Sequence, residues 1–252
     1  MKYILVFFLV VIGFNVNSQE IKPLLIGGSG LMSSDKYNKG HYHFAYFEHK
    51  FIKNQAGSNA FGFYAKYNYW QGIYDGKTQE RINSFGVGLS LGMIPSYLFS
   101  YDVYNNISFG YRQAYNQKWT KYEGLPQEEK KFVDITMYSH IQDEYKTFFF
   151  RHKLFVDISC NVDSSLTKEY FRIKFDESIY NFYLTDKLNL APKIIAGYTN
   201  NAWHNFYELG LGLDLFGEWF VNIVDLSYIY RYDPEIDKNS FHEISLAINF
   251  LN

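Results

Sequence analysis

Two segments of the chain carry several charged side chains spaced two residues apart, a spacing that could bind or orient ions and polar solutes. In residues 146–158 and 166–177 the charges alternate with apolar residues such as Leu154 and Ile173, and later segments continue the pattern. In a β-strand alternate side chains point to the same face, so the sequence predicts one charged face. Its members are Arg151, Lys153, Asp157, Arg172, Lys174, Asp176, Glu208, Asp214, Asp225, Arg231 and Glu243.

This charged face has two interpretations. The basic segments near 151–174 could stand opposite the acidic later segments across an open space, where their field would orient polar solutes. Alternatively, the same charges could pair as salt bridges and fill the interior. His152 contradicts the alternation because it falls on the apolar face, and we expect a bulge or a strand end there.

The histidines are the other candidates for chemistry. His41, His43 and His49 share one face of a predicted strand, and the pair His41 and His43 could bind a transition metal. Two histidines without a third ligand make a weak site, so surface histidines near a loop are the simpler interpretation. A single cysteine, Cys160, excludes a disulfide framework and a multi-cysteine metal site. We expect no cofactor and no metal.

The elements that must position these residues have a period of two. In FGVGLSLGM (residues 85–93) the large apolar residues occupy one face and glycine or serine the other, a pattern typical of a strand. The glycines predict a crowded interior in which aromatic side chains lie across the backbone. We therefore predict an all-β fold, a single antiparallel transmembrane β-barrel of about 12 strands, in the range of roughly 10 to 14. The predicted strands are 23–32, 41–52, 59–71, 80–93, 97–112, 131–141, 146–158, 166–177, 187–199, 205–217, 219–232 and 241–251.

The connections between the predicted strands differ in length. Those after even-numbered strands are mostly short, although residues 177–186 form a longer one. Those after odd-numbered strands are longer and polar, for example residues 72–79 and 113–130. Short turns at one end and long loops at the other are typical of a transmembrane barrel whose ends face different compartments.

The N-terminus predicts export. Lys2 precedes eleven apolar residues, Ile4 to Phe14, which would rise about 16 Å against a hydrocarbon core of about 30 Å. We therefore expect a signal peptide over residues 1–18 and a barrel domain over residues 19–252. The formal net charge of -2 gives no electrostatic reason to bind nucleic acid.

The final segment, FHEISLAINFLN, resembles the last strand of Gram-negative outer-membrane β-barrels, although Phe250 is followed by two further residues. This resemblance implies location in the outer membrane, contact with its lipid, and recognition of the C-terminal strand by the barrel-assembly machinery. Aromatic girdles are also expected at the membrane interfaces, because the four tryptophans, Trp70, Trp119, Trp203 and Trp219, and many tyrosines fall at or near predicted strand ends.

Two functions stay open after this comparison. A narrow passive pore for small polar solutes is the first, because twelve strands lie between filled eight-stranded barrels and open sixteen-stranded porins. A closed structural barrel that binds a surface partner through loop 113–130 is the alternative. A barrel enzyme is third, since no histidine has a serine two residues later and no aspartate has Asp or His there, as known barrel hydrolases do.

Overall fold

The chain forms a closed barrel of twelve antiparallel strands with one extra short strand. The computed structural model describes residues 24–34, 39–53, 59–74, 77–93, 102–118, 125–143, 150–163, 167–178, 180–185, 188–201, 205–216, 222–234 and 240–250. None of these ranges contains a helix long and apolar enough to cross a membrane. The predicted signal peptide, residues 1–18, lies outside them.

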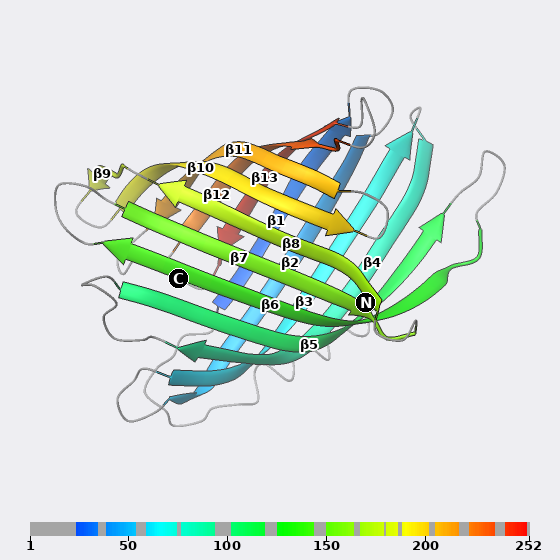
Figure 1. The fold of residues 1–252 in the computed structure, drawn as a ribbon, viewed down its shortest axis with the longest axis horizontal. Helices are drawn as coiled ribbons and strands as arrows, with labels where there is room; N and C mark the ends of the chain where they lie inside the picture. The colour runs from blue at the N-terminus through cyan, green and yellow to red at the C-terminus, as the bar shows by residue number, and fades with distance from the viewer. Residues whose placement is uncertain are drawn as a thin grey trace.

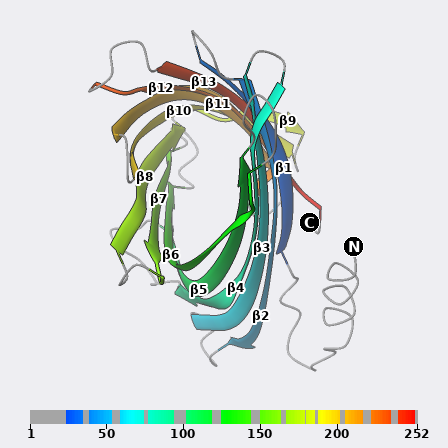
Figure 2. The same ribbon diagram turned by 90° about the vertical axis from the view of Figure 1, so that its right-hand side faces the viewer.

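The strands follow one another around the barrel, and the first pairs with the last (Figures 1 and 2). Closure runs from Ile26 opposite Asn249 to Ser34 opposite Phe241. We call the end where β1 begins and β13 ends the terminal end, and the other the distal end. The strands are β1 Leu24–Ser34, β2 Lys39–Lys53, β3 Asn59–Tyr74, β4 Lys77–Met93, β5 Asp102–Lys118, β6 Glu128–Asp143, β7 Phe150–Asn161, β8 Thr167–Ser178, β9 Phe182–Thr185, β10 Leu188–Asn201, β11 Asn205–Phe216, β12 Asn222–Tyr232 and β13 Ser240–Asn249.

The extra strand β9 lies within the segment that the sequence predicts as a long connection. Phe182 and Tyr183 of β9 pair with Leu190 and Asn189 of β10, beyond the point where the pairing of β8 with β10 ends. Aromatic and β-branched residues favour extended backbone, which explains why this short segment continues the sheet.

The predicted alternation of connection lengths is wrong. Connections after odd-numbered barrel strands range from two residues, 75–76, to nine, 119–127. Those at the terminal end range from five residues, 54–58, to nine, 179–187, which include β9. Polar residues that the sequence assigns to loops continue the ladder instead, since Gln113 of β5 pairs with Lys131 of β6. A run of polar residues in this chain therefore does not mark the end of a strand, because the strand continues through it.

The two faces of the sheet differ as the period of two predicts. Leu211 is 64% exposed on the outer face, whereas Asp214, three residues further along β11, is fully buried on the inner face. An apolar outer face around a polar interior is the arrangement of a barrel surrounded by lipid. Further exposed outer residues are Ile107, Phe109, Ile135, Met137, Phe175, Ile194, Leu209, Leu226, Ile244 and Leu246.

The predicted crowding over interior glycines is confirmed where Tyr64 crosses β4 and β5. A Cβ on Gly88 would lie 2.7 Å from Tyr64 Cε1 and closer still to the Phe109 carbonyl oxygen, and one on Gly110 would meet Tyr64 Oη. At Gly212 the covering group is a lysine stem, because Lys193 Cε would be 2.6 Å away. Glycine therefore lets large side chains of neighbouring strands lie flat against the wall.

We expect Gly88→Val to destabilise the barrel by roughly 1–3 kcal/mol, the usual cost of overpacking. The matched control is Gly86→Ala, where the nearest group is the flexible stem of Lys66 at 3.1 Å. The measurement is the urea concentration at which each variant unfolds in lipid vesicles. Equal midpoints for both variants would show that Tyr64 can move aside.

Trp70 corrects the girdle prediction. Its ring contacts Gly72, and lies 3.5 Å from the Cβ position of Gly40, on the inner face of the sheet, whereas a girdle residue faces lipid. Trp119, Trp203 and Trp219 lie outside the described residues. The tyrosines of the predicted girdle fare better, because exposed tyrosines lie on the outer face toward the distal end, namely Tyr67, Tyr111, Tyr207, Tyr228 and Tyr232.

Candidate functional site

A buried carboxylate, Asp214 on β11, is the centre of the first charged cluster inside the barrel. Lys153 Nζ lies 2.5 Å from its Oδ2 and Lys193 Nζ lies 2.8 Å from its Oδ1. Arg151 Nη1 lies 3.5 Å from Oδ2 and stacks on Phe216. These cations come from β7 and β10, so the cluster joins two strands to a third. The Asp214 cluster comprises Arg151, Lys153, Lys174, Asp176, Lys193, Asp214 and Asp225.

Glu208 on β11 is the centre of a second cluster nearer the distal end. Arg172 Nη2 donates to its Oε2 at 2.6 Å, and Arg231 Nε donates to its Oε1 at 3.1 Å. Arg231 also bridges to Glu243 at 2.5 Å. The Glu208 cluster comprises Tyr42, Arg172, Thr199, Glu208, Arg231 and Glu243. Both carboxylates of this cluster, Glu208 and Glu243, lie beside an arginine. This attraction offsets the cost of removing the carboxylates from water.

A third cluster, around Asp134 on β6, was not among the predicted residues. Lys66 Nζ lies 2.5 Å from Asp134 Oδ2, Arg112 Nε lies 2.8 Å from the same atom, and Ser159 donates at 2.6 Å. Lys66 and Arg112 come from β3 and β5, so contacts reach across three strands. The period of two in residues 131–141 could have predicted that Asp134 points inward. It could not have predicted the partners of Asp134, because these lie on other strands.

The structure brings together ten of the eleven predicted residues, since all except Asp157 belong to the first two clusters. Asp157 lies half-buried on the same inner face, opposite Arg172 in the register of β7 and β8. Basic groups of β7 and β8 contact acidic groups of β11 directly. The charges are thus salt-bridged along the wall, which favours the second of the two interpretations given by the sequence.

In these clusters the cation is generally the more exposed partner. Lys66 is 21% exposed and Asp134 3%; Arg172 is 21% exposed and Glu208 fully buried; Lys174 is 17% exposed and Asp176 2%. Asp225 is the reverse case, at 26% beside a fully buried Lys193. Because these side chains point inward, the charges that water reaches inside the barrel are mainly positive.

The inner face of β3 to β5 is lined by smaller polar groups. Asn68 is exposed although it points inward, and its Nδ2 lies 3.4 Å from Ser84 Oγ. Gly86, Ser84 and Ser108 leave little side-chain volume around it. Water therefore reaches the inner wall beside Asn68, on the side away from the Asp214 cluster.

His152 lies on the outer face, as the alternation implies, and near the beginning of β7 at Phe150. Its Nδ1 contacts Glu177 Oε2 of β8, which stands directly opposite in the register. The expected strand end is confirmed. The expected bulge is wrong at this position, because the irregularity in β7 falls between Ser159 and Cys160.

His41 and His43 also face outward, with ring centroids 5.5 Å apart and both near Tyr69. Within the described ranges no three His, Cys, Asp or Glu side chains are grouped as a metal site requires. Ser29 stands opposite His43 in the register of β1 and β2, a neighbour relation that a search along one strand misses. A serine nucleophile needs a base that a third group orients, and the two flanking residues in that row, Leu246 and Tyr69, carry no carboxylate.

Comparisons with known proteins agree with this architecture. No family model and no curated protein matches the chain in sequence. In structure it is similar to the β domain of the Bordetella autotransporter Brka, with 12% identity and a TM-score of 0.57 over 91% of this chain and 99% of that chain. It is also similar to the transport unit of the autotransporter AIDA-I from Escherichia coli, with 12% identity and a TM-score of 0.54 over 95% of this chain and 93% of that one.

Likeness at this level of identity shows the fold and not the activity. Together with the apolar outer face, it shows that the chain has the fold of outer-membrane β-barrels. The predicted recognition is thereby confirmed at the level of the fold, and the predicted location in the outer membrane agrees with that fold.

Proposed function

We propose that the protein is a narrow passive channel for small polar solutes and that it prefers anions. The observation that carries the proposal is the arrangement of the inner charges, in which Lys66, Arg172 and Lys174 are the water-exposed partners of buried carboxylates. Charged side chains along a constriction decide which ion enters at lower cost. The Asp214 cluster fills one side of the interior, and solutes pass along the side bounded by Asn68.

Planar-bilayer recording under a potassium chloride gradient tests this function. The wild type is expected to conduct. Its zero-current potential should have the sign that is expected when chloride is more permeant than potassium. The double variant Lys66→Gln/Lys174→Gln removes two exposed cations, while Asp134 keeps Arg112 and Asp176 keeps Lys193 as partners. Each lost charge about 4 Å from the ion path weakens anion attraction by about 1 kcal/mol, so the chloride-to-potassium permeability ratio should fall roughly fivefold or more.

The control is Lys39→Gln/Lys131→Gln, which removes the same net charge from the outer face at strand ends. Its permeability ratio should equal that of the wild type. A folded wild type that never conducts would refute the channel and favour the alternative, a closed barrel with a surface partner. In that alternative, the loop that binds the partner is shorter than the predicted loop 113–130. It comprises residues 119–127, because residues 113–118 belong to β5 and residues 128–130 to β6.

The final strand supports a second part of the proposal, which is recognition by the barrel-assembly machinery. In β13 the outer-face residues Ile244 and Leu246 are exposed, and so is Phe250 directly after the strand. Truncation after Asn249 should then lower the yield of assembled barrel in cells while leaving refolding of the purified chain into vesicles unchanged.

A further inference from the structure

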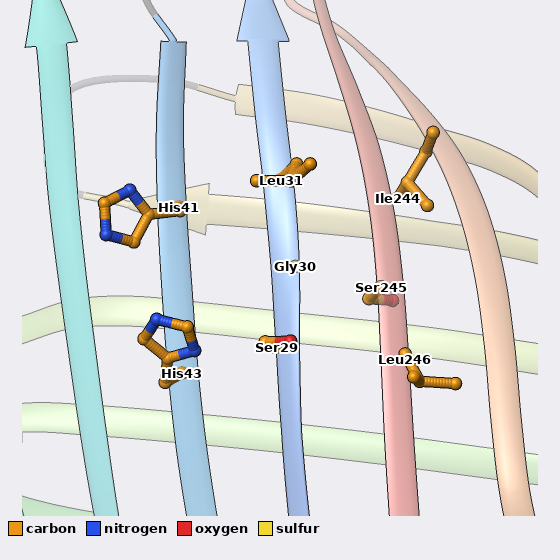
Figure 3. Close-up of a pocket in the computed structure, with 8 residues that line it drawn as sticks. All are labelled: Ser29, Gly30, Leu31, His41, His43, Ile244, Ser245 and Leu246. Carbon is orange, nitrogen blue, oxygen red and sulfur yellow. The ribbon is translucent and has the colours of Figure 1, made fainter.

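A shallow groove crosses the outer face where β13, β1 and β2 meet. It has a volume of about 430 Å³ and is open along one side. Figure 3 shows Ile244 and Leu246 of β13 on one side and His41 and His43 of β2 on the other, with Ser29, Gly30 and Leu31 of β1 between them. Ser29 leaves room for the groove, because its neighbours in the same outward-facing row, His43 and Leu246, carry larger side chains. The wall on β13 is apolar, and the wall on β2 carries imidazoles.

The groove lies where the outer face changes from apolar to polar. In the register His43 stands beside Tyr69 and Asn83, and the next row toward the distal end contains His41, Gln71 and Arg81. One row toward the terminal end the outer residues are Ala45, Tyr67 and Phe85. In a barrel surrounded by lipid this change marks the level at which acyl chains give way to head groups.

The charged side chain at this level, Arg81, is basic. From β1 to β4 the two polar rows described above contain His41, His43 and Arg81 and no carboxylate. Arg81 is exposed and lies two strands from His41, about 10 Å at the usual strand spacing. Imidazole N–H groups and a guanidinium are donors suited to phosphate oxygens.

We propose that this groove binds a lipid with a phosphate-bearing head group. One acyl chain lies over Ser29 between Leu31 and Leu246, and the phosphate accepts hydrogen bonds from His41 and His43. An outer-membrane barrel is covered by lipid over this whole face, so the occupant's class follows from the location of the protein. The polar rows select the anionic head group. The inference does not depend on whether the lumen conducts.

Native mass spectrometry of the purified protein in detergent tests the site. The probes are phosphatidylglycerol and phosphatidylcholine with identical acyl chains, added separately at equal concentration. The wild type should retain phosphatidylglycerol in preference to phosphatidylcholine. In His41→Ala/His43→Ala that preference should fall about tenfold, because the variant loses two hydrogen bonds to a charged group.

The matched control is His49→Ala, which lies on the same outer face of β2 but toward the terminal end, beside Phe63. Its preference should equal that of the wild type. Ser29→Phe fills the groove and should weaken retention of both lipids. Equal retention of the two lipids by the wild type would refute the site, as would an unchanged preference in the double histidine variant. Appearance of a dimer in place of lipid adducts would assign the groove to a second copy of the chain.

Discussion

Asp214→Ala is expected to prevent assembly of the barrel. The substitution leaves Arg151, Lys153 and Lys193 together without the carboxylate that contacts all three, and each of these cations is at most 5% exposed. Removing one partner of a buried ion pair costs about 3–5 kcal/mol, and here three cations would also repel one another. The measurement is the heat-modifiable mobility of the refolded protein on a gel, in which the folded band should disappear.

The control for this prediction is Asp225→Ala. Asp225 is 26% exposed and shares Lys193 with Asp214 and Asp176, so its loss leaves no cation alone. Its folded band should persist. A folded band of wild-type intensity for Asp214→Ala would mean that water enters the Asp214 cluster and solvates the cations.

Leu211→Arg should be the next most harmful change. Leu211 is 64% exposed on the outer face of β11, between Leu209 and Leu213. An arginine facing lipid at the membrane midplane costs about 2–4 kcal/mol, falling to near 1 or less at the interfaces. We expect this variant to lose most of its folded fraction in vesicles, measured by the same gel assay.

Gln113→Arg is the matched control on the same outer face. Gln113 lies opposite Phe85 in the register, one row to the terminal side of the polar rows, and its side chain donates to Glu129, so an arginine there gains a carboxylate partner. It should assemble as the wild type does. Equal loss of folded protein in the two variants would show that depth in the membrane does not decide the cost.

The period of two was enough to predict the barrel and the side of each charge. Arg151, Lys153, Arg172 and Lys174 all point inward, because alternation is a property of one strand and needs no knowledge of its neighbours. The same reasoning placed every barrel strand at a segment close to its observed range.

The partners of those charges could not be predicted, because they depend on register between strands that are distant in sequence. Lys66 meets Asp134 across three strands, and Tyr42 meets Glu243 through the closure of β1 on β13. A shift of one residue between two strands would turn either side chain to the other face. The sequence-based prediction also ended strands where polar residues begin. It therefore ended β5 too early and began β6 too late, and it placed Trp70 near a strand end, where a residue would face the lipid interface.

Thiol labelling inside the barrel tests most directly whether water and anions reach a lumen lined by cations. The protein is Asn68→Cys in a Cys160→Ser background, since Asn68 is an exposed inward residue and Cys160 is the natural cysteine. An anionic methanethiosulfonate should modify the folded barrel several-fold faster than a cationic one of similar size, and modification should reduce the current in planar bilayers. No reaction before unfolding, or faster reaction with the cationic reagent, would contradict the account.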